Sequence, residues 1–186
     1  MRSAPTSSTL VRYWVPERSL IGDAGLVFAF SLITALMAHI AIPLPFTPVP
    51  ITGQTFAVLL TGAALGARLG MASMLAYITE GVLGLPVFAA APGAASYGYL
   101  AGFVVAAVII GWLADHGWTR DLPHTVAAMV AGEVAIYLFG LLWLARFVPL
   151  SQVLALGLFP FLIGDAIKLA AAAAVLPAGW RLSRNR

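Results

Sequence analysis

Long runs of apolar residues, separated by short breaks rich in proline, glycine and charge, dominate the chain. Within each run the apolar residues are continuous and do not alternate with a period of two, so the runs predict helices. A bilayer core about 30 Å thick needs roughly 20 mostly apolar residues for each helical span. We predict spans at residues 20–41, 54–69, 71–89, 97–114, 124–146 and 152–177. The pattern therefore predicts an all-α membrane protein with six transmembrane helices.

Composition agrees with this class of protein. Of the 186 residues, 61% are hydrophobic and 9% are charged, whereas soluble domains contain about 25% charged residues. Six spans leave no room for a separate catalytic or nucleotide-binding domain. The net charge of +3 comes from dispersed basic residues without a patch for nucleic acid, and the lack of cysteine excludes disulfides and thiolate metal sites.

The basic residues predict the orientation of the chain. With six spans, Arg146 falls alone on one side of the membrane, and eight other arginines fall on the opposite side. Those eight are Arg2, Arg12, Arg18, Arg68, Arg120, Arg181, Arg184 and Arg186. The positive-inside rule then places both termini in the cytoplasm. We expect a cytoplasmic segment at 1–19, a six-helix domain at 20–178 and a cytoplasmic basic tail at 179–186.

The stretch IPLPFTPVPITGQTF, residues 42–56, separates the first apolar run from the second and contains four prolines. Proline lacks an N–H and favours extended conformations before it, so we expect a stiff, polyproline-like segment that packs back onto the bundle. One interpretation is a lid over an outward-facing pocket, where Thr52 and Gln54 hydrogen-bond a polar ligand. The other is a rigid connector in which Thr52 caps the next helix. Both interpretations fit the sequence.

A second break, at residues 80–96, falls on the same predicted side. Its glycines and prolines end the third helix early and predict an irregular outer segment. The second, fourth and sixth helices all begin at this outer face, so their positive dipole ends favour an anionic group there.

Four charged residues lie well inside predicted spans: Glu80, Glu133, Asp165 and Lys168. Each costs about 2.5–3.5 kcal/mol at a helix centre on insertion scales. Asp165 and Lys168, the only lysine, are three positions apart and share one helix face. Either they form a structural ion pair, or together they bind a ligand carboxylate. We expect structural roles for Glu80 and Glu133, and we interpret His116 and His124 as solvated loop residues.

Small residues recur every four positions and predict close helix packing. In the first helix, two pairs of small residues have this spacing: Gly25 with Ala29, and Ser31 with Ala35. These pairs serve packing inside the bundle, or one face docks another membrane subunit.

At this point four segments together resemble the BioY family, the biotin-binding substrate-capture (S) components of energy-coupling factor (ECF) transporters. They are IPLPFTPVPITGQTFAVLLTGAALG, EGVLGLPVFA, YGYLAGF and GDAIK. The resemblance covers nearly the whole chain after residue 20. It implies the six-helix S-component fold, capture of biotin under the loop between the first two helices, and a location in the bacterial cytoplasmic membrane.

The resemblance also implies particular contacts. Lys168 would bind the biotin carboxylate or another electronegative group, and Asp165 would accept from a ligand N–H or orient Lys168. Further ligand contacts would come from Thr52, Gln54, Tyr99, Phe46 and Phe88. The family's GPTGGYL reads GAASYGYL here, so Ser96 or Tyr97 would replace the threonine.

The resemblance implies partners as well: a transmembrane coupling subunit and two cytoplasmic ATPases, because this sequence has no Walker A motif. Small residues of the first helix would dock the coupling subunit: Gly25, Ala29, Ser31 and Ala35. A homo-oligomer is left open, no cofactor is expected, and ATP would be hydrolysed only by partner subunits. The alternatives are an intramembrane enzyme or a proton or ion channel that uses the buried carboxylates. For an enzyme, the sequence offers neither a nucleophile motif nor a set of metal-ligating residues.

Overall fold

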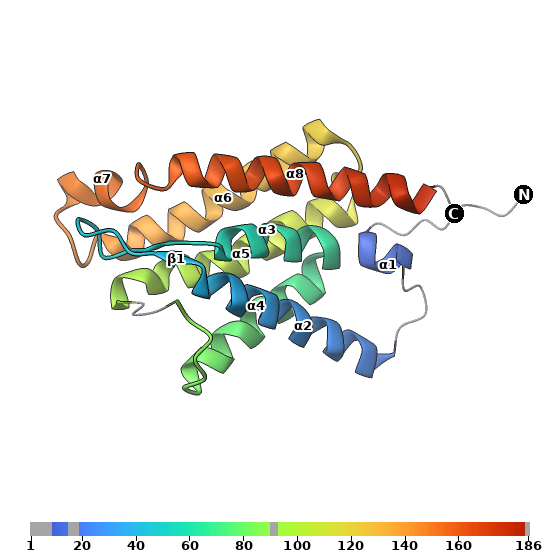
Figure 1. The fold of residues 1–186 in the computed structure, drawn as a ribbon, viewed down its shortest axis with the longest axis horizontal. Helices are drawn as coiled ribbons and strands as arrows, with labels where there is room; N and C mark the ends of the chain where they lie inside the picture. The colour runs from blue at the N-terminus through green and yellow to red at the C-terminus, as the bar shows by residue number, and fades with distance from the viewer. Residues whose placement is uncertain (1–8, 15–18, 90–92, 185–186) are drawn as a thin grey trace, which may run out of the picture.

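The computed structural model describes residues 9–14, 19–89 and 93–184, and in these ranges the protein is a bundle of helices (Figure 1). The helices are α1 (Leu10–Trp14), α2 (Leu20–His39), α3 (Gln54–Leu65), α4 (Ala67–Val82), α5 (Tyr97–Asp115), α6 (Leu122–Leu144), α7 (Val153–Gly157) and α8 (Leu162–Arg184). Two short strands, β1 (Ala41–Ile42) and β2 (Ile51–Thr52), pair antiparallel, with Ala41 opposite Thr52. Single 3₁₀ turns precede α5 and α7, at Ala94–Ser96 and Leu150–Gln152.

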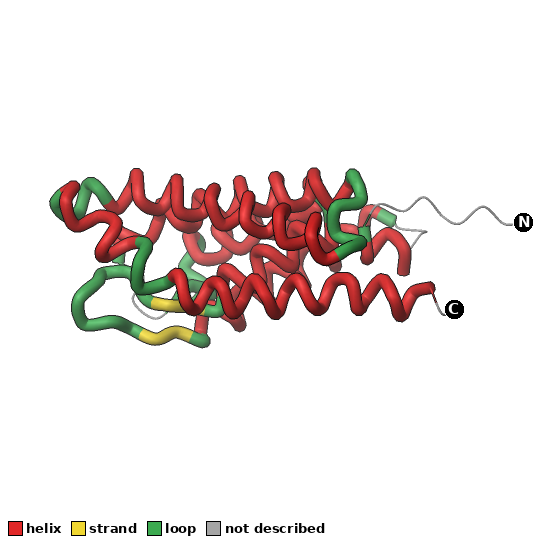
Figure 2. Tube along the Cα trace, turned by 90° about the horizontal axis from the view of Figure 1, so that it is seen from above, coloured by secondary structure: helices red, strands yellow, loops and turns green. Residues whose placement is uncertain are grey.

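The two ends of the bundle differ in character. The β1–β2 hairpin and α7 lie at one end, and α1 lies near the last turns of α8 at the other (Figures 1 and 2). The proline-rich residues 43–50 form the loop of the hairpin, so they are a closed arch with a paired base and not an isolated polyproline segment. The irregular backbone between α2 and α3 therefore lies at one end of the molecule.

The helices account for the predicted spans to different degrees. Three described helical segments are long and apolar enough to cross a membrane: Leu20–His39, Ala94–Asp115 and Leu122–Leu144. The bent pair Leu150–Gly157 and Leu162–Leu176 makes a fourth if it is one span. By contrast, α3 has 12 residues and α4 has 16. The helical membrane architecture is confirmed, and the count of six crossings stays a prediction.

Two predicted boundaries fall elsewhere because glycines adopt positive φ. Gly66 (φ 83°) ends α3 and begins α4, so the predicted second span stops short of residue 69. The side chain of Asp115 fills the space at this turn and accepts the N–H of Ala67 at 3.0 Å. Gly84 (φ 88°) follows the end of α4, which therefore does not reach residue 89.

The predicted sixth span is broken. It begins with the short α7, turns through Leu158–Phe161, and continues as α8 at an angle of 44°. Pro160 lies in this break and cannot donate to a helical carbonyl. Beyond the predicted end at 177, α8 continues to Arg184, so the helix includes most of the expected basic tail.

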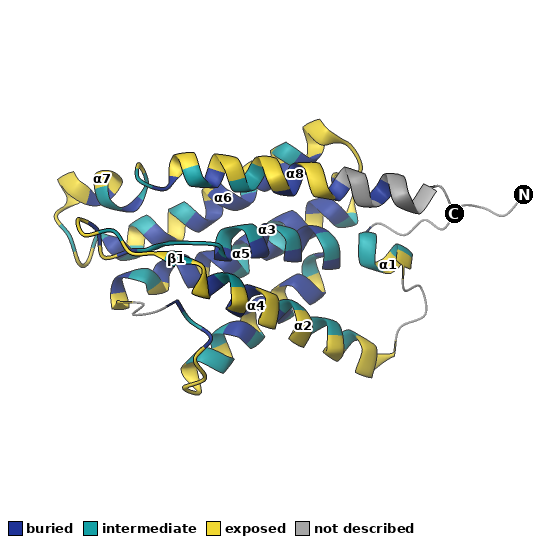
Figure 3. Cartoon of the chain, in the orientation of Figure 1, coloured by how far each residue is buried: buried dark blue, intermediate teal, exposed yellow. Residues whose placement is uncertain are grey.

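Close packing in the core depends on small residues of α5, as the sequence predicts. A Cβ atom on Gly102 would lie 2.8 Å from the Cα atom of Ile136, so only glycine allows α6 to approach here. Further along α5, Ala106, Ala107 and Ile110 are fully buried. Figure 3 shows the buried residues along the inner helix faces, with exposed positions on the outer faces of α2 and α8.

The loop before α6 is polar and exposed. The N-cap residue Asp121 accepts from the backbone N–H of His124 at 3.1 Å and from its ring Nδ1 at 2.7 Å. These contacts hold the pKa of the Asp121 carboxyl below its usual range, with the backbone hydrogen bond as the largest cause. The exposed side chain of His124 agrees with our interpretation of this histidine as a loop residue.

Candidate ligand-binding site

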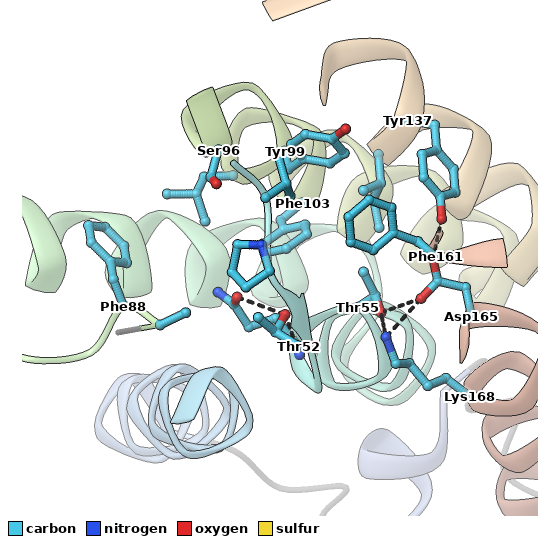
Figure 4. Close-up of a pocket in the computed structure, with 16 residues that line it drawn as sticks. Thr52, Thr55, Phe88, Ser96, Tyr99, Phe103, Tyr137, Phe161, Asp165 and Lys168 are labelled. Carbon is cyan, nitrogen blue, oxygen red and sulfur yellow. Dashed lines mark hydrogen bonds and ion pairs between the residues drawn. The ribbon is translucent and has the colours of Figure 1, made fainter. Parts of the chain in front are cut away.

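A cavity of about 640 Å³ lies among the first turns of α3, α5 and α8, next to the proline-rich arch (Figure 4). This volume counts all empty space between the lining atoms, including the part that is open to solvent. The lining residues are Val49, Pro50, Thr52, Gln54, Thr55, Phe88, Ala89, Ser96, Tyr99, Leu100, Phe103, Ile136, Tyr137, Phe161, Asp165 and Lys168. Because three helices begin at this cavity, their positive dipole ends point toward it, as the sequence predicts.

One side of the cavity carries charge. Lys168 Nζ lies 2.8 Å from Asp165 Oδ1, and the two residues are one turn apart on α8. The Thr55 hydroxyl connects them, since it accepts from Lys168 at 3.0 Å and donates to Asp165 at 3.2 Å. Tyr137 donates to the other carboxylate oxygen, Oδ2. Every polar atom of Asp165 is thus satisfied, and this carboxylate orients the ammonium group of Lys168 (Figure 4).

The sequence analysis did not select Thr55 or Tyr137. Thr55 directly follows Gln54, in the one polar stretch near the start of the second apolar run. Tyr137 is a tyrosine in the middle of an apolar helix, where its hydroxyl needs a partner. Either signal could have pointed to the residue, but only the fold shows that both meet Asp165.

A second polar group lies where the hairpin meets α3. The Thr52 hydroxyl donates to Gln54 Oε1 at 3.0 Å and accepts the backbone N–H of Gln54 at 3.4 Å. The N-cap residue of α3 is Gly53, so Thr52 is not the cap itself. Gln54 is buried but lines the cavity, and its Nε2 atom donates to the hydroxyl of Tyr77 at 2.6 Å.

The remaining walls are largely aromatic. The rings of Phe88, Tyr99, Phe103 and Phe161 line the cavity. The Tyr99 hydroxyl donates to the carbonyl of Gly157 at 2.8 Å, so its ring faces the cavity while its polar atom holds α7. An apolar ring or chain of a ligand can therefore pack against these side chains.

Ser96 lies on the cavity wall as a free hydrogen-bonding group. Its Oγ atom is buried and has no hydrogen-bond partner within the described part of the chain. A buried hydroxyl without a partner is costly. Of the two residues considered as replacements for the family's threonine, Ser96 is the one that reaches the cavity.

The proline-rich arch packs onto the bundle, as expected. The Thr47 hydroxyl donates to the carbonyl of Leu156 at 2.7 Å and accepts the N–H of Val49 at 3.3 Å. At the base of the hairpin, the N–H of Gly53 lies 3.1 Å from the carbonyl of Met37 in α2. Val49 and Pro50 then form part of the cavity wall.

Two predicted ligand contacts do not reach the cavity. Phe46 lies at the tip of the arch and is 59% exposed, because the turn there directs its side chain away from the bundle. Tyr97 is 48% exposed and lines an outer groove with Phe139 and Trp143. It lies two positions from Tyr99, about 200° around the helix, and therefore faces away.

The predicted docking residues divide between two faces of α2. Gly25 and Ala29 are exposed, and no other group lies within 4 Å of a Cβ added to Gly25. Ser31 and Ala35 are 0% and 6% exposed, and Ser31 hydrogen-bonds Glu80 of α4, so this pair packs inside the bundle, which is the other role that the sequence left open. Six positions separate Gly25 from Ser31, a rotation of about 240°, so the two pairs cannot share a face.

The other two carboxylates inside the bundle differ in their surroundings. Glu80 accepts a hydrogen bond from the Ser31 hydroxyl at 2.5 Å, which links α4 to α2 and fits a structural role. Glu133 is 7% exposed, and neither of its carboxylate oxygens has a hydrogen-bond partner in the described ranges. It does not line the cavity, and it lies one turn before Tyr137 on α6.

The fold and the cavity define a helical membrane protein with a pocket that has polar and apolar walls. The sequence profile of the BioY family matches residues 7–185, and the chain belongs to this family. It is 37% identical to the probable biotin transporter BioY of Pyrococcus horikoshii over 156 residues, which cover 81% of this chain and 91% of the relative. With the biotin transporter BioY of Thermotoga maritima it shares 36% identity over 153 residues, covering 78% and 88% of the two chains.

The fold itself also has a solved counterpart. The crystal structure of the S-component for biotin from an ECF-type ABC transporter matches with a TM-score of 0.78 and 22% identity. The match covers 91% of this chain and 96% of that chain. The prediction of an S-component fold is confirmed.

Proposed function

We propose that this protein captures biotin and serves its uptake as the S component of an ECF-type transporter. The observation that carries the proposal is the cavity, which combines an ammonium group at one side, amide and hydroxyl groups at the other, and aromatic walls between them. Biotin has matching parts: a carboxylate, a polar ureido ring and an apolar chain. Family membership and the names of the relatives support the same ligand.

In this proposal the biotin carboxylate binds Lys168, where Asp165 and Thr55 orient the ammonium group. The ureido ring lies near Gln54 and Ser96, which offer hydrogen bonds, and Thr52 completes this polar side. Phe88 and Tyr99 contact the apolar parts of the ligand. Asp165 acts mainly on Lys168, because its oxygens already accept from Lys168, Thr55 and Tyr137.

The arch at residues 43–50 is the entrance in this proposal. It contributes Val49 and Pro50 to the cavity wall, and a single side-chain bond from Thr47 ties its tip region to α7. Biotin would enter from the outer face when the arch lifts. The arch end would face outward and both termini would face the cytoplasm, in a six-span arrangement in the cytoplasmic membrane.

Transport would need further subunits. A transmembrane coupling subunit would dock at Gly25 and Ala29 on the exposed face of α2, and two cytoplasmic ATPases would supply the energy. The S-component fold and membership of the BioY family support this part of the proposal. The function proposed for this chain itself is binding, not catalysis.

The test is equilibrium binding of labelled biotin to the purified full chain, with unlabelled riboflavin and dethiobiotin as competitors. We expect saturable binding at one site per chain that biotin and, more weakly, dethiobiotin displace. A closely related apolar analogue is seldom rejected strongly. Displacement by riboflavin, or no binding by a folded sample, would contradict the proposal.

A further inference from the structure

A chain of four hydrogen-bonding groups runs from the wall of the cavity into the core behind it. The Thr52 hydroxyl donates to Gln54 Oε1 at 3.0 Å, and Gln54 Nε2 donates to the Tyr77 hydroxyl at 2.6 Å. Tyr77 in turn donates to the backbone carbonyl of Val87 at 3.1 Å. Tyr77 is 0% exposed and does not line the cavity, so it can affect a ligand only through its neighbours.

The last group in this chain fixes the direction of every hydrogen bond. A backbone carbonyl can only accept, so the single hydroxyl proton of Tyr77 goes to Val87. The Tyr77 oxygen must then accept from Gln54, and only the Nε2 end of the amide can donate. The Oε1 end is thereby directed to Thr52, and the amide of Gln54 has one permitted orientation.

This orientation leaves a defined pair of groups on the amide. An amide has two N–H donors and two acceptor lone pairs on its oxygen. Tyr77 uses one donor and Thr52 uses one lone pair, which leaves one of each on a side chain that lines the cavity. A ligand group with an acceptor next to a donor, such as a cyclic urea, matches this pair.

We propose that Tyr77 is a positioning residue for the ligand, because it locks the Gln54 amide in the orientation that recognises a urea-type group. This inference rests on the proposed function. It adds a residue that fixes where the donor and acceptor ends of the Gln54 amide lie in the cavity wall.

The same tyrosine also supports the apolar wall beside Gln54. Its ring lies edge-to-face against Phe88, with the centroids 5.5 Å apart, and its hydroxyl holds the neighbouring Val87. One turn further along α4, a Cβ on Gly81 would overlap the ring of Phe88, so glycine leaves room for this ring. Residues of α4 thus position both the amide and the phenyl ring that the ligand meets.

A double-mutant cycle on biotin affinity tests the proposal. Tyr77→Phe keeps the ring but removes both hydroxyl bonds, so Gln54 can rotate, and we expect biotin Kd to rise by about tenfold. Gln54→Leu should raise Kd at least as much. In the Gln54→Leu background, Tyr77→Phe should change Kd by less than about twofold, because the group it positions is gone. Tyr97→Phe is the control and should leave Kd unchanged, since this exposed tyrosine lies outside the cavity.

The outcomes separate this inference from the proposed function. Equal effects of Tyr77→Phe in both backgrounds would mean a general structural role and would overturn the inference, as would unchanged affinity in Tyr77→Phe or in Gln54→Leu. Loss of biotin binding by the unmodified chain would instead defeat the proposed function. If Tyr77→Phe does not fold, Gln54→Glu takes its place, because glutamate lacks the free N–H. Affinity kept within about twofold in Gln54→Glu would also overturn the inference.

Discussion

Single residues divide the cavity into a charged side and a hydrogen-bonding side. Lys168 is held by Asp165 and Thr55, and Gln54 is held by Thr52 and Tyr77. Polar side chains held in place before the ligand arrives lose less entropy on binding. The two groups therefore act as preformed contacts for the two polar ends of a ligand.

Replacing Lys168 with alanine should weaken biotin binding by at least about tenfold, or about 1.4 kcal/mol, because the ligand carboxylate loses its charged partner. The measurement is titration of the purified variant with labelled biotin. Arg146→Gln is the control, because Arg146 stacks over Trp143 at 4.8 Å and does not line the cavity. Equal affinity of the Lys168 variant and the unmodified protein would refute the assignment.

Replacing Ser96 with alanine should separate affinity from stability. Its buried Oγ atom has no partner in the described ranges, so its loss costs the ligand-free protein nothing and leaves the melting temperature unchanged or slightly higher. Biotin Kd should rise about two- to tenfold if the hydroxyl binds the ligand. Thermal unfolding and biotin titration of one preparation check both statements. A lower melting temperature with unchanged affinity would show that Ser96 is structural.

At the scale of elements, the proline-rich arch and α2 have separate roles in the proposed mechanism: the arch opens for the ligand, and α2 docks the coupling subunit. The arch is fixed at its base by the β1–β2 pair and near its tip by the bond from Thr47 to Leu156. The sequence predicted a stiff segment packed on the bundle because prolines exclude a helix. It could not predict the contact with α7, because that helix is more than 100 residues further along the chain.

Thr47→Val should accelerate biotin release. Valine has nearly the shape of threonine but cannot donate to Leu156, so the arch should open more often and the dissociation rate should rise severalfold. Stopped-flow displacement of labelled biotin measures this rate. Thr79→Val is the matched control, because Thr79 bonds only within α4 at an exposed position. An unchanged rate would mean that the arch does not limit release.

Substitutions on α2 should separate the two faces of this helix. Ala29 is exposed, so Ala29→Phe should leave biotin binding and stability unchanged and should reduce uptake in cells that contain the partner subunits. Ala35 is 6% exposed, and Ala35→Phe should destabilise the chain by about 1–3 kcal/mol through overpacking. Uptake and binding are measured for each variant. Loss of binding in Ala29→Phe would show that this face belongs to the bundle.

For the molecule as a whole, the sequence predicted the helical membrane architecture because long apolar runs are a direct consequence of the bilayer. The orientation that the arginines indicate stays a prediction. The sequence also selected residues that line the cavity: Thr52, Gln54, Phe88, Tyr99, Asp165, Lys168 and, as one of two options, Ser96. The apolar pattern does not fix how a helix is rotated, so the sequence could not decide that Tyr97 is exposed or that Ser31 and Ala35 are buried. The sequence also missed Tyr77 and Tyr137, because their partners Gln54 and Asp165 lie on other helices.

The most direct test of the central claim compares biotin with its neutral carboxamide, biotinamide, on the unmodified protein and on Lys168→Ala. If Lys168 binds the ligand carboxylate, the unmodified protein should prefer biotin by at least about tenfold, and the variant should bind the two ligands almost equally. The same preference for biotin in both proteins would show that another group binds the carboxylate, and would contradict the orientation of biotin proposed for this cavity.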